Sequence, residues 1–450
     1  MTEILSSAKA GNKKPVTYAL LAGTALALIS MSGVRAADSI DAGALYEPLP
    51  TFKASDLLPP EIMRGELHTV LETVENDGYE NNFTITSQFG TITAHRTDFV
   101  AERVQEVYAL DKLSEITRSD AFAKGVAQAA TSPFRALKGL ATEPVGTVTG
   151  AVKGIGALFS QLGGMASGSR GELEDSAAKE LVGFGEIKRE VAGLLEVDPY
   201  TTNQAIQEGI GEVSWAGFAG GLSLAPLTAQ VGGGVGAALS GVQNARTLNS
   251  LLTSQSPEAL RGINRIRLEE IGVDDALIEK FVESPWLSPR HETTITAALI
   301  QMDGTENHGA ILERATVSES EDQSIFLMRQ AEASLGFHQN VAAIARFERV
   351  DQIVLLYTAD NRAVSVLPAD HLVWSEGAES LADQNVSAGA LRELWLTGSI
   401  SDLARSEFKK RGWAVVAGQS DKLAPDLDAG LAGEEVSEDE GSEEGSAEDE

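Results

Sequence analysis

The stretch VSWAGFAGGLSLAPLTAQVGGGVGAALSGVQNA, from Val213 to Ala245, holds 33 residues and no charged side chain. It lies in a chain of 450 residues with 35 basic and 66 acidic residues, a net charge of −31. So long an uncharged run in an acidic chain indicates a segment that packs against something other than water. Three interpretations are open: an element that spans a membrane, a segment that rests on one, or a closely packed glycine and alanine core.

Small residues recur at every fourth position in this part of the chain. Gly232, Gly236 and Ser240 follow this spacing, and an earlier series comprises Gly146, Gly150 and Gly154. Each glycine costs a helix about 1 kcal/mol relative to alanine, so the spacing favours positions where a neighbouring backbone comes close. The uncharged stretch also contains polar residues and few large apolar ones, which weakens its transfer into lipid. Close packing within protein is therefore the leading interpretation.

Residues 119–170 carry five basic and two acidic residues, a local charge of +3. An apolar stripe at three- and four-residue spacing runs through them and comprises Val145, Val148, Val152, Ile155, Phe159 and Leu162. A basic helix with one apolar face can lie on an anionic lipid surface. The segment Pro144–Gly164 therefore keeps a membrane surface open as a partner beside a protein.

The N-terminus has the features of a secretory signal peptide. Three lysines precede an apolar run from Tyr18 to Ser30, and Val34 and Ala36 occupy the positions that a cleavage site requires. The run is shorter than the about 20 residues that a membrane span needs. We expect cleavage after Ala36 and a periplasmic or extracellular protein; an uncleaved anchor is the alternative.

Composition excludes several classes of function. The chain contains no cysteine, so disulfides, thiolate nucleophiles, Fe–S clusters and cysteine zinc sites are excluded. The net charge argues against general nucleic-acid binding. The H-E-x-x-H, G-x-S-x-G and phosphate-loop motifs are missing. No cofactor or metal is expected, since the histidines are scattered at His68, His95, His291, His308, His338 and His371.

Two dipeptides are candidates for acid–base chemistry. His291-Glu292 is expected in the first turn of a helix, where Glu292 suits the positive helix end and His291 lies at the surface. Asp370-His371 follows a strand, where polar residues generally solvate a turn. Catalytic residues are therefore unknown, and a hydrolytic site assembled by the fold near His291 or His371 is only an alternative.

The pattern predicts a mainly helical α+β protein with small antiparallel β-hairpins, a Gly/Ala-rich helical centre and a disordered acidic tail. The last 17 residues contain ten acidic and no basic side chains, which favours disorder by self-repulsion. The division expected from composition is a signal peptide, an α+β region, the glycine-rich centre, a helical domain with a hairpin, and the tail, at residues 1–36, 37–118, 119–250, 251–420 and 421–450.

Local signals place the individual elements. Hairpins are expected at Phe83–His95 and Gln352–Pro368, and a helix is expected from Thr97 to about Ile116. Further helices are expected at Pro59–Val74, 172–197, 388–396 and 402–411, and a strand at 413–417. Helix starts are expected at Ser256-Pro257, at Ser288-Pro289 and at a Ser318/Glu321 capping box.

Five phrases carry a resemblance: SDAFAKG at Ser119, EPVGTVTGAVKGIG at Glu143, DPYTTN at Asp198, WAGFAGG at Trp215 and SPRHETTITAALIQMDG at Ser288. Together they resemble a group of uncharacterised exported bacterial proteins. The group has no assigned activity, so the resemblance implies export and no catalytic residue.

The leading hypothesis is an exported, non-enzymatic protein that acts by association through its glycine-rich helical centre, with a protein or a membrane surface as partner. The alternatives are a membrane-inserting or pore-type protein and a hydrolase.

Overall fold

The computed structural model describes residues 45–129, 183–224, 246–387 and 389–430. The alternation of apolar and polar residues after Asn81 gives the predicted first hairpin, in which β4 (Asn81–Ser87) pairs with β5 (Gly90–His95). Its apolar side chains, among them Phe83 and Ile85, are fully buried on one face. The hairpin predicted at Phe83–His95 is confirmed.

Three short strands extend this hairpin into an antiparallel sheet of order β1-β3-β4-β2, with β5 on the other side of β4. They are β1 (Thr51–Lys53), β2 (His68–Val70) and β3 (Thr73–Asn76). The helix predicted from Pro59 to Val74 is wrong for most of its length, because only α2 (Pro60–Met63) is helical there. The β-branched Thr69, Val70, Thr73 and Val74 favour strands, and Val70 pairs with Ile85 of β4.

Helices follow the sheet. The short 3₁₀ helix η1 (Thr97–Phe99) leads into α3 (Val100–Thr117), whose apolar face is buried as predicted. A short helix, α1 (Ala54–Leu57), precedes them in the chain. The helices that follow α3 are α4 (Asp120–Ala129), α7 (Phe184–Leu194), α8 (Gln204–Gly220) and α10 (Arg246–Ser254). Asn203 caps α8 by accepting the Ala205 N–H, as the polar residues after Pro199 indicate.

A second group of helices forms around α13 and comprises α11 (Pro257–Glu270), α12 (Asp275–Val282), α13 (Pro289–Ile300), α14 (Gly309–Ala315) and α15 (Glu321–Asn340). The predicted caps Ser256 and Ser288 are confirmed, each with proline at the first helical position. The capping box predicted at Ser318 is wrong. Ser320 caps α15 by accepting the Gln323 N–H, because it offers the same pattern two residues later.

The C-terminal sheet has the order β12-β10-β8-β7-β6. Its strands are β6 (Ile344–Val350), β7 (Ile353–Thr358), β8 (Arg362–Leu367), β10 (Leu391–Leu396) and β12 (Trp413–Val416). The first three form an antiparallel meander, which includes the predicted hairpin, whereas β8, β10 and β12 are parallel. The helix predicted at 388–396 is wrong, since β10 occupies it.

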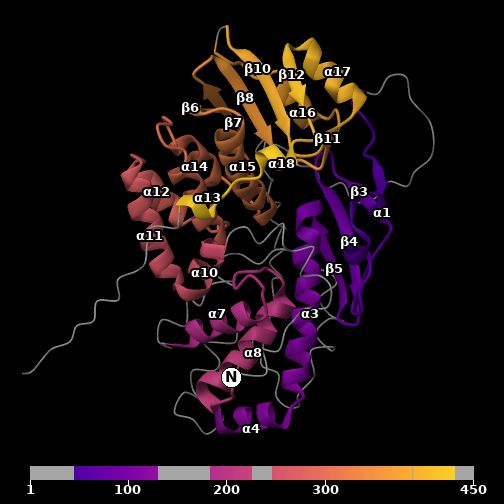
Figure 1. Ribbon diagram of the computed structural model, residues 1–450, viewed down its shortest axis with the longest axis vertical. Coiled ribbons are helices and arrows are strands. Elements are labelled where there is room, and N and C mark those ends of the chain that lie inside the picture. Colours follow the sequence, from indigo (N-terminus) through magenta and orange to yellow (C-terminus); the bar gives the residue numbers. More distant parts are fainter. Residues whose placement is uncertain (1–44, 130–182, 225–245, 388, 431–450) are drawn as a thin grey trace, which may run out of the picture. The chain divides into compact units, whose positions relative to one another are not determined.

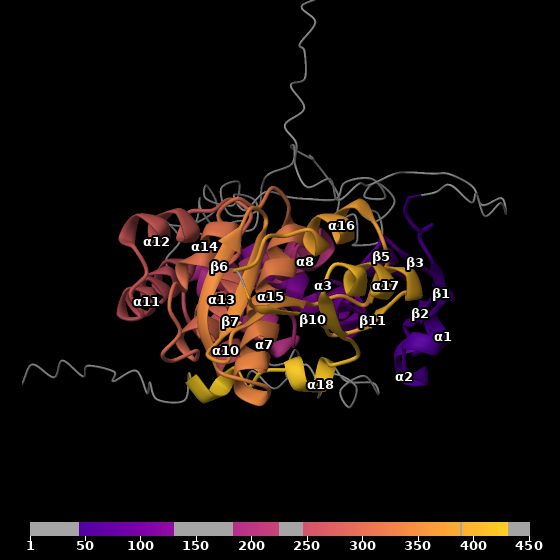
Figure 2. The same ribbon diagram turned by 90° about the horizontal axis from the view of Figure 1, so that it is seen from above.

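Helices cover both faces of this sheet (Figure 1; Figure 2). Along β7, Val354 and Leu356 join the core beneath α14 and α15, and Leu355 and Tyr357 join the core on the other face. The second face is covered by α16 (Glu376–Ala382) and α17 (Asp402–Lys410), which provide the crossovers between the parallel strands. A strand buried on both faces explains the uninterrupted apolar run from Ile353 to Tyr357. The small parallel ladder β9 (His371–Leu372) with β11 (Ser399–Ile400) lies at the ends of these strands.

The end of the described chain packs back onto the helices as a strap, residues 420–430. It contains α18 (Ser420–Leu423) and the 3₁₀ turn η6 (Asp428–Gly430), and it buries Leu423 and Leu427 in the core around α13. A Cβ on Gly336 of α15 would lie 2.2 Å from the Leu423 carbonyl oxygen, so only glycine allows this approach. The Asp428 carboxylate accepts the Thr247 and Leu248 N–H groups at the start of α10.

The mixed α+β class is confirmed, with two five-stranded sheets in place of small hairpins alone. All described elements belong to one compact unit, residues 39–450. The predicted signal peptide, the segment Pro144–Gly164 and the acidic tail lie outside the described residues. The predicted domain boundaries stay predictions.

Truncation distinguishes the strap from the tail. A chain cut after Gly433 keeps Leu423, Leu427 and Asp428, and we expect its melting temperature to equal that of the full chain. A chain cut after Gln419 loses two buried leucines, each of which contributes about 2 kcal/mol, and we expect a clearly lower melting temperature. Calorimetry of both chains checks this, and equal melting temperatures for all three would contradict it.

Candidate functional site

The described part of the glycine-rich centre is a helical platform made of α4, α7 and α8. Helix α4 lies against the end of α8, and their backbones almost touch: a Cβ on Gly220 would lie 1.9 Å from the Gly125 carbonyl oxygen. On the facing helix, a Cβ on Gly125 would lie 3.3 Å from the Ala216 carbonyl oxygen. The two glycines therefore permit a contact that larger residues would prevent.

Helix α8 makes a second close contact further along its length, in this case with a side chain. A Cβ on Gly209 would lie 2.9 Å from Leu113 of α3. The buried small residues of α8 are Ala205, Gly209, Ala216 and Gly220, at steps of four, seven and four residues. The other glycine series, at residues 146–154 and 232–241, lie outside the described residues.

An aromatic cluster joins the ends of the platform helices. Phe184 at the start of α7 lies edge-on to Trp215 and Phe218 of α8, each with ring centroids 6.0 Å apart. Ala129 at the end of α4 packs in the same buried cluster. Residues 130–182 therefore begin and end at one place, and residues 225–245 begin at the end of α8 nearby. The platform thus contains the residues that flank the segment with the basic stripe, and helix α8 contains the first part of the uncharged run.

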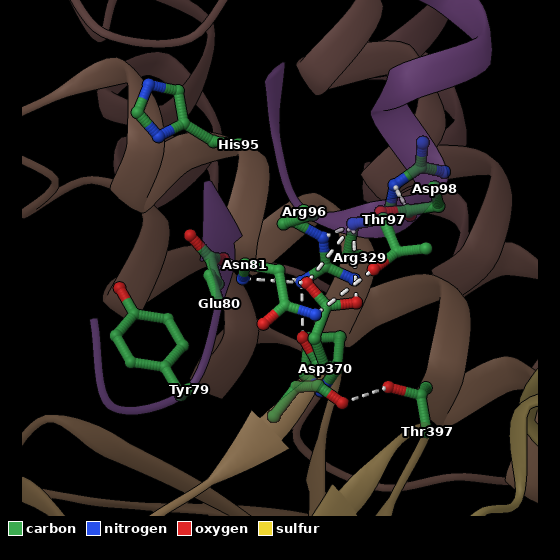
Figure 3. A network of polar contacts seen from close by, with 12 residues as sticks. Tyr79, Glu80, Asn81, His95, Arg96, Thr97, Asp98, Arg329, Asp370 and Thr397 are labelled. Atoms are coloured by element: carbon green, nitrogen blue, oxygen red, sulfur yellow. Dashed lines mark hydrogen bonds and ion pairs between the residues drawn. The ribbon is translucent and has the colours of Figure 1, made fainter. Parts of the chain in front are cut away.

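A second candidate site is a buried polar junction, here defined as Tyr79, Glu80, Asn81, Arg96, Thr97 and Asp370 (Figure 3). Its centre is Arg96, which is 5% exposed and has φ 78°, a left-handed conformation that costs a non-glycine residue roughly 1 kcal/mol or more. Its backbone N–H donates to the Asn81 carbonyl at 2.7 Å. Its guanidinium donates to Asp98 and to the Pro368 carbonyl and lies 3.5 Å from Glu80.

Asp370 joins the C-terminal sheet to the N-terminal sheet. Its carboxylate accepts the Asn81 N–H at 3.0 Å and the Thr97 N–H at 3.1 Å. Its own N–H donates to the Tyr79 carbonyl at 2.8 Å. The interpretation that Asp370 solvates a turn is therefore wrong, because its carboxylate bonds to backbone groups more than 270 residues away.

Burial sets the protonation of the junction. Desolvation raises the pKa of Glu80 to about 8, against the attraction of Arg96, and Asp77, Asp370 and Asp322 raise it further. Burial likewise raises the pKa of Asp370. Burial opposes ionisation of Asp98 too, but Arg96 and Arg329 outweigh it and lower the pKa of that carboxyl. Glu80 and Asp370 of the junction therefore have raised pKa values, whereas Asp98 beside them has a lowered pKa.

His371 contacts Ser399, with 2.7 Å between Nδ1 and Oγ. The two residues are partners in the parallel ladder of β9 and β11, which explains their proximity. Burial lowers the pKa of His371. A serine hydrolase also needs donors for an oxyanion, but the Gly398 and Ser399 N–H groups already donate to Ala369 and Asp370 carbonyls. Ser399 and His371 therefore provide a hydroxyl and a base, but the Gly398 and Ser399 amides do not form an oxyanion hole beside them.

The prediction that His291 lies at the surface is wrong. His291 and Glu292 are both buried, with 7% and 0% of their surface areas exposed. The reason is that α13 lies at the centre of its helical group and is buried along almost its whole length. His291 completes the capping box of α13, since its Nδ1 accepts the Ser288 N–H at 3.1 Å. Burial, with Arg290 and Arg329 nearby, lowers its pKa to about 3. Glu292 Oε2 lies 3.9 Å from Arg261 Nε.

A cavity of about 50 Å³ adjoins the start of α13, large enough for about three or four water molecules. The ionisable residues in its lining are Glu102, Arg103, Asp198, Arg290, His291, Glu321 and Arg329. The arginines are already paired: Arg290 Nε lies 2.6 Å from Asp198, Arg103 Nη1 lies 2.8 Å from Glu106, and Arg329 Nη1 lies 2.8 Å from Glu332. These ion pairs make the cavity part of the internal packing of the molecule.

Asp98 connects the two polar regions. One carboxylate oxygen accepts from Arg96 and the other lies 3.2 Å from Arg329, whose guanidinium also stacks 4.9 Å from the Phe99 ring centroid. Within the part of the chain that the structure describes, no three His, Asp or Glu side chains come together to hold a metal ion. Among those same residues, no helix is long and apolar enough to cross a membrane.

No family model, curated protein or solved structure matches this chain.

The platform contact predicts a matched pair of substitutions in α8. Gly220→Ala places a methyl group against the Gly125 backbone, and we expect the free energy of unfolding to fall by about 1–3 kcal/mol. Gly211→Ala meets no atom within 4 Å and removes a helix-destabilising glycine, so stability should rise by up to about 1 kcal/mol. Urea denaturation measures both, and equal effects would contradict the close contact.

His291 predicts an acid sensitivity. Its pKa is about 3 in the folded chain and 6.5 ordinarily, so the unfolded chain binds more protons between these values and stability falls as the pH drops through this window. His291→Gln keeps an acceptor for the Ser288 N–H and removes the titrating ring. Between about pH 6 and pH 4 we expect the variant to lose about 2–3 kcal/mol less than the unaltered chain.

The control for this measurement is His95→Gln, because His95 is exposed and lies outside the helical core. Its stability profile should follow that of the unaltered chain. Identical acid profiles for all three chains in urea denaturation would show that His291 does not titrate as described.

Proposed function

We propose that this is an exported, non-enzymatic protein that acts by association, with the platform of α4, α7 and α8 presenting the glycine-rich segments to a protein partner. The observation that supports this is the packing of Ala129 and Phe184, which lie on either side of residues 130–182, in one buried cluster with Trp215. The sequence with the basic, apolar-striped pattern is therefore flanked at both ends by a packed base. A rigid base reduces the entropy that ordering the segments on a partner would cost.

Export is part of the proposal. Three lysines before an apolar run and the small residues at Val34 and Ala36 support cleavage after Ala36 and a periplasmic or extracellular protein. A chain without cysteine has no need of an oxidising compartment for its fold. The net charge of −31 supports partners other than nucleic acid.

Replacement of Pro144–Gly164 by a glycine-serine linker of equal length tests the proposal. This change leaves α4, α7 and α8 intact, so the melting temperature should not change. We expect the amount of partner protein cross-linked to the chain and recovered from envelope extracts to fall at least about tenfold, because the central contacts of an interface supply most of its binding energy. The control is the same kind of replacement of the acidic residues 434–450, which should leave capture unchanged.

The alternatives are separate outcomes of the same experiment. One such outcome is that the unaltered chain stays in membranes through an alkaline carbonate wash while the linker variant is released. This result would show membrane insertion and would overturn association with a protein partner. Among the described residues, the Ser399–His371 contact is the one observation that favours a hydrolase. Hydrolytic activity that His371→Ala abolishes and the linker leaves intact would overturn the proposal.

A further inference from the structure

Two arginines converge on the turn between β6 and β7, where helix α14 packs against these strands (Figure 1). Arg314, near the end of α14, donates from Nε to the Gln352 carbonyl at 3.0 Å. Arg349 of β6 donates from Nε to the Asp351 carbonyl at 2.8 Å and from Nη1 to the Glu313 carbonyl at 3.1 Å. Backbone carbonyls therefore fix both guanidiniums at one turn of the chain.

The charge of this pair of arginines is poorly compensated. Arg314 is 8% exposed, and its Nη1 is shielded from solvent and has no hydrogen-bond partner among the described residues. Burial lowers the pKa of Arg314, the like charge of Arg349 lowers it further, and Glu319 offsets these effects only in part. Glu313 Oε2 lies 3.9 Å from Arg349 Nη1, too far for a hydrogen bond. Two neighbouring cations thus share one loosely held carboxylate.

This arrangement departs from the rest of the molecule. The chain has 66 acidic and 35 basic residues, so carboxylates are abundant. The arginines around the cavity at α13 have close carboxylate partners: Arg290 lies 2.6 Å from Asp198, and Arg329 lies 2.8 Å from Glu332. A buried cation without a close counter-charge destabilises a fold. An anion from outside the chain would supply the charge that is missing beside α14.

We propose that Arg314 and Arg349 form a binding site for inorganic phosphate. A doubly charged oxyanion matches two adjacent cations, and guanidinium N–H groups bond strongly to phosphate oxygens. Arg349 makes the contact, because its side chain is 25% exposed, and Arg314 adds its charge from the buried side. The backbone contacts hold both side chains in place beforehand, which reduces the entropy lost on binding. The site does not depend on the glycine-rich segments.

Isothermal titration calorimetry of the full chain with inorganic phosphate tests this proposal. At about pH 8, where phosphate carries nearly two charges, we expect one saturable site with a Kd on the order of 1 mM. Arg349→Gln should raise the Kd at least about tenfold, because it removes charge-assisted hydrogen bonds. Arg314→Gln should also raise it, because one of two attracting charges is lost. Glu313→Gln should lower the Kd, because the carboxylate that competes for Arg349 is gone.

The matched controls are Arg265→Gln and Glu279→Gln, which break an exposed ion pair of 2.7 Å elsewhere and should change the Kd less than about twofold. Acetate, with one charge, should bind at least about tenfold more weakly than phosphate. Should Arg314→Gln not fold, the more exposed Arg349→Gln decides. Three results would each overturn the proposal: no saturable phosphate binding by the unaltered chain, undiminished binding by Arg349→Gln, or acetate that binds as tightly as phosphate.

Discussion

The buried guanidinium of Arg96 is the interaction on which the arrangement of the two sheets depends. It stands in a left-handed conformation, bonds to the Pro368 carbonyl and pairs with Asp98, which in turn meets Arg329 of α15. A buried cation without these partners would cost several kcal/mol. The N-terminal sheet, the 3₁₀ turn η1 and α15 are therefore tied to one another through a single side chain, and Asp370 reinforces the connection from the opposite side.

The second constraint is the near contact of Gly125 and Gly220. It brings α4 against α8 with almost no side-chain volume between them, and it fixes the positions from which the glycine-rich segments start. Packing forces act over short distances, so such a contact is stiff. The polar junction, by contrast, depends on a few charges and backbone bonds. The molecule thus combines a rigid base with a polar joint.

Local signals in the sequence predicted local features. The caps at Ser256 and Ser288 depend on residues within one turn, and the hairpin at Phe83–His95 depends on alternation within one segment. The failures depend on distant partners. Residues 391–396 have helix-like apolar spacing but form a strand, because β8 and β12 pair with them on either side. His291 was expected at the surface because one helix start does not show how many helices surround it.

The candidate sites follow the same division. The small residues along α8 and their partner glycine on α4 were not predicted, because the spacings noted in the sequence fall at 146–154 and 232–240, outside the described residues. Asp370 stood out as a polar residue after a strand, but its partners Asn81 and Thr97 are too distant in sequence for any local pattern to indicate them. Arg96 carried no signal at all in the sequence.

The strap has a consequence for the timing of folding. Leu423 and Leu427 complete the core around α13, yet they follow every other element of that core along the chain. A growing chain therefore leaves this core open until the strap has been made. Folding of the core around α13 thus waits for a segment that follows its last helix, α15, by about eighty residues.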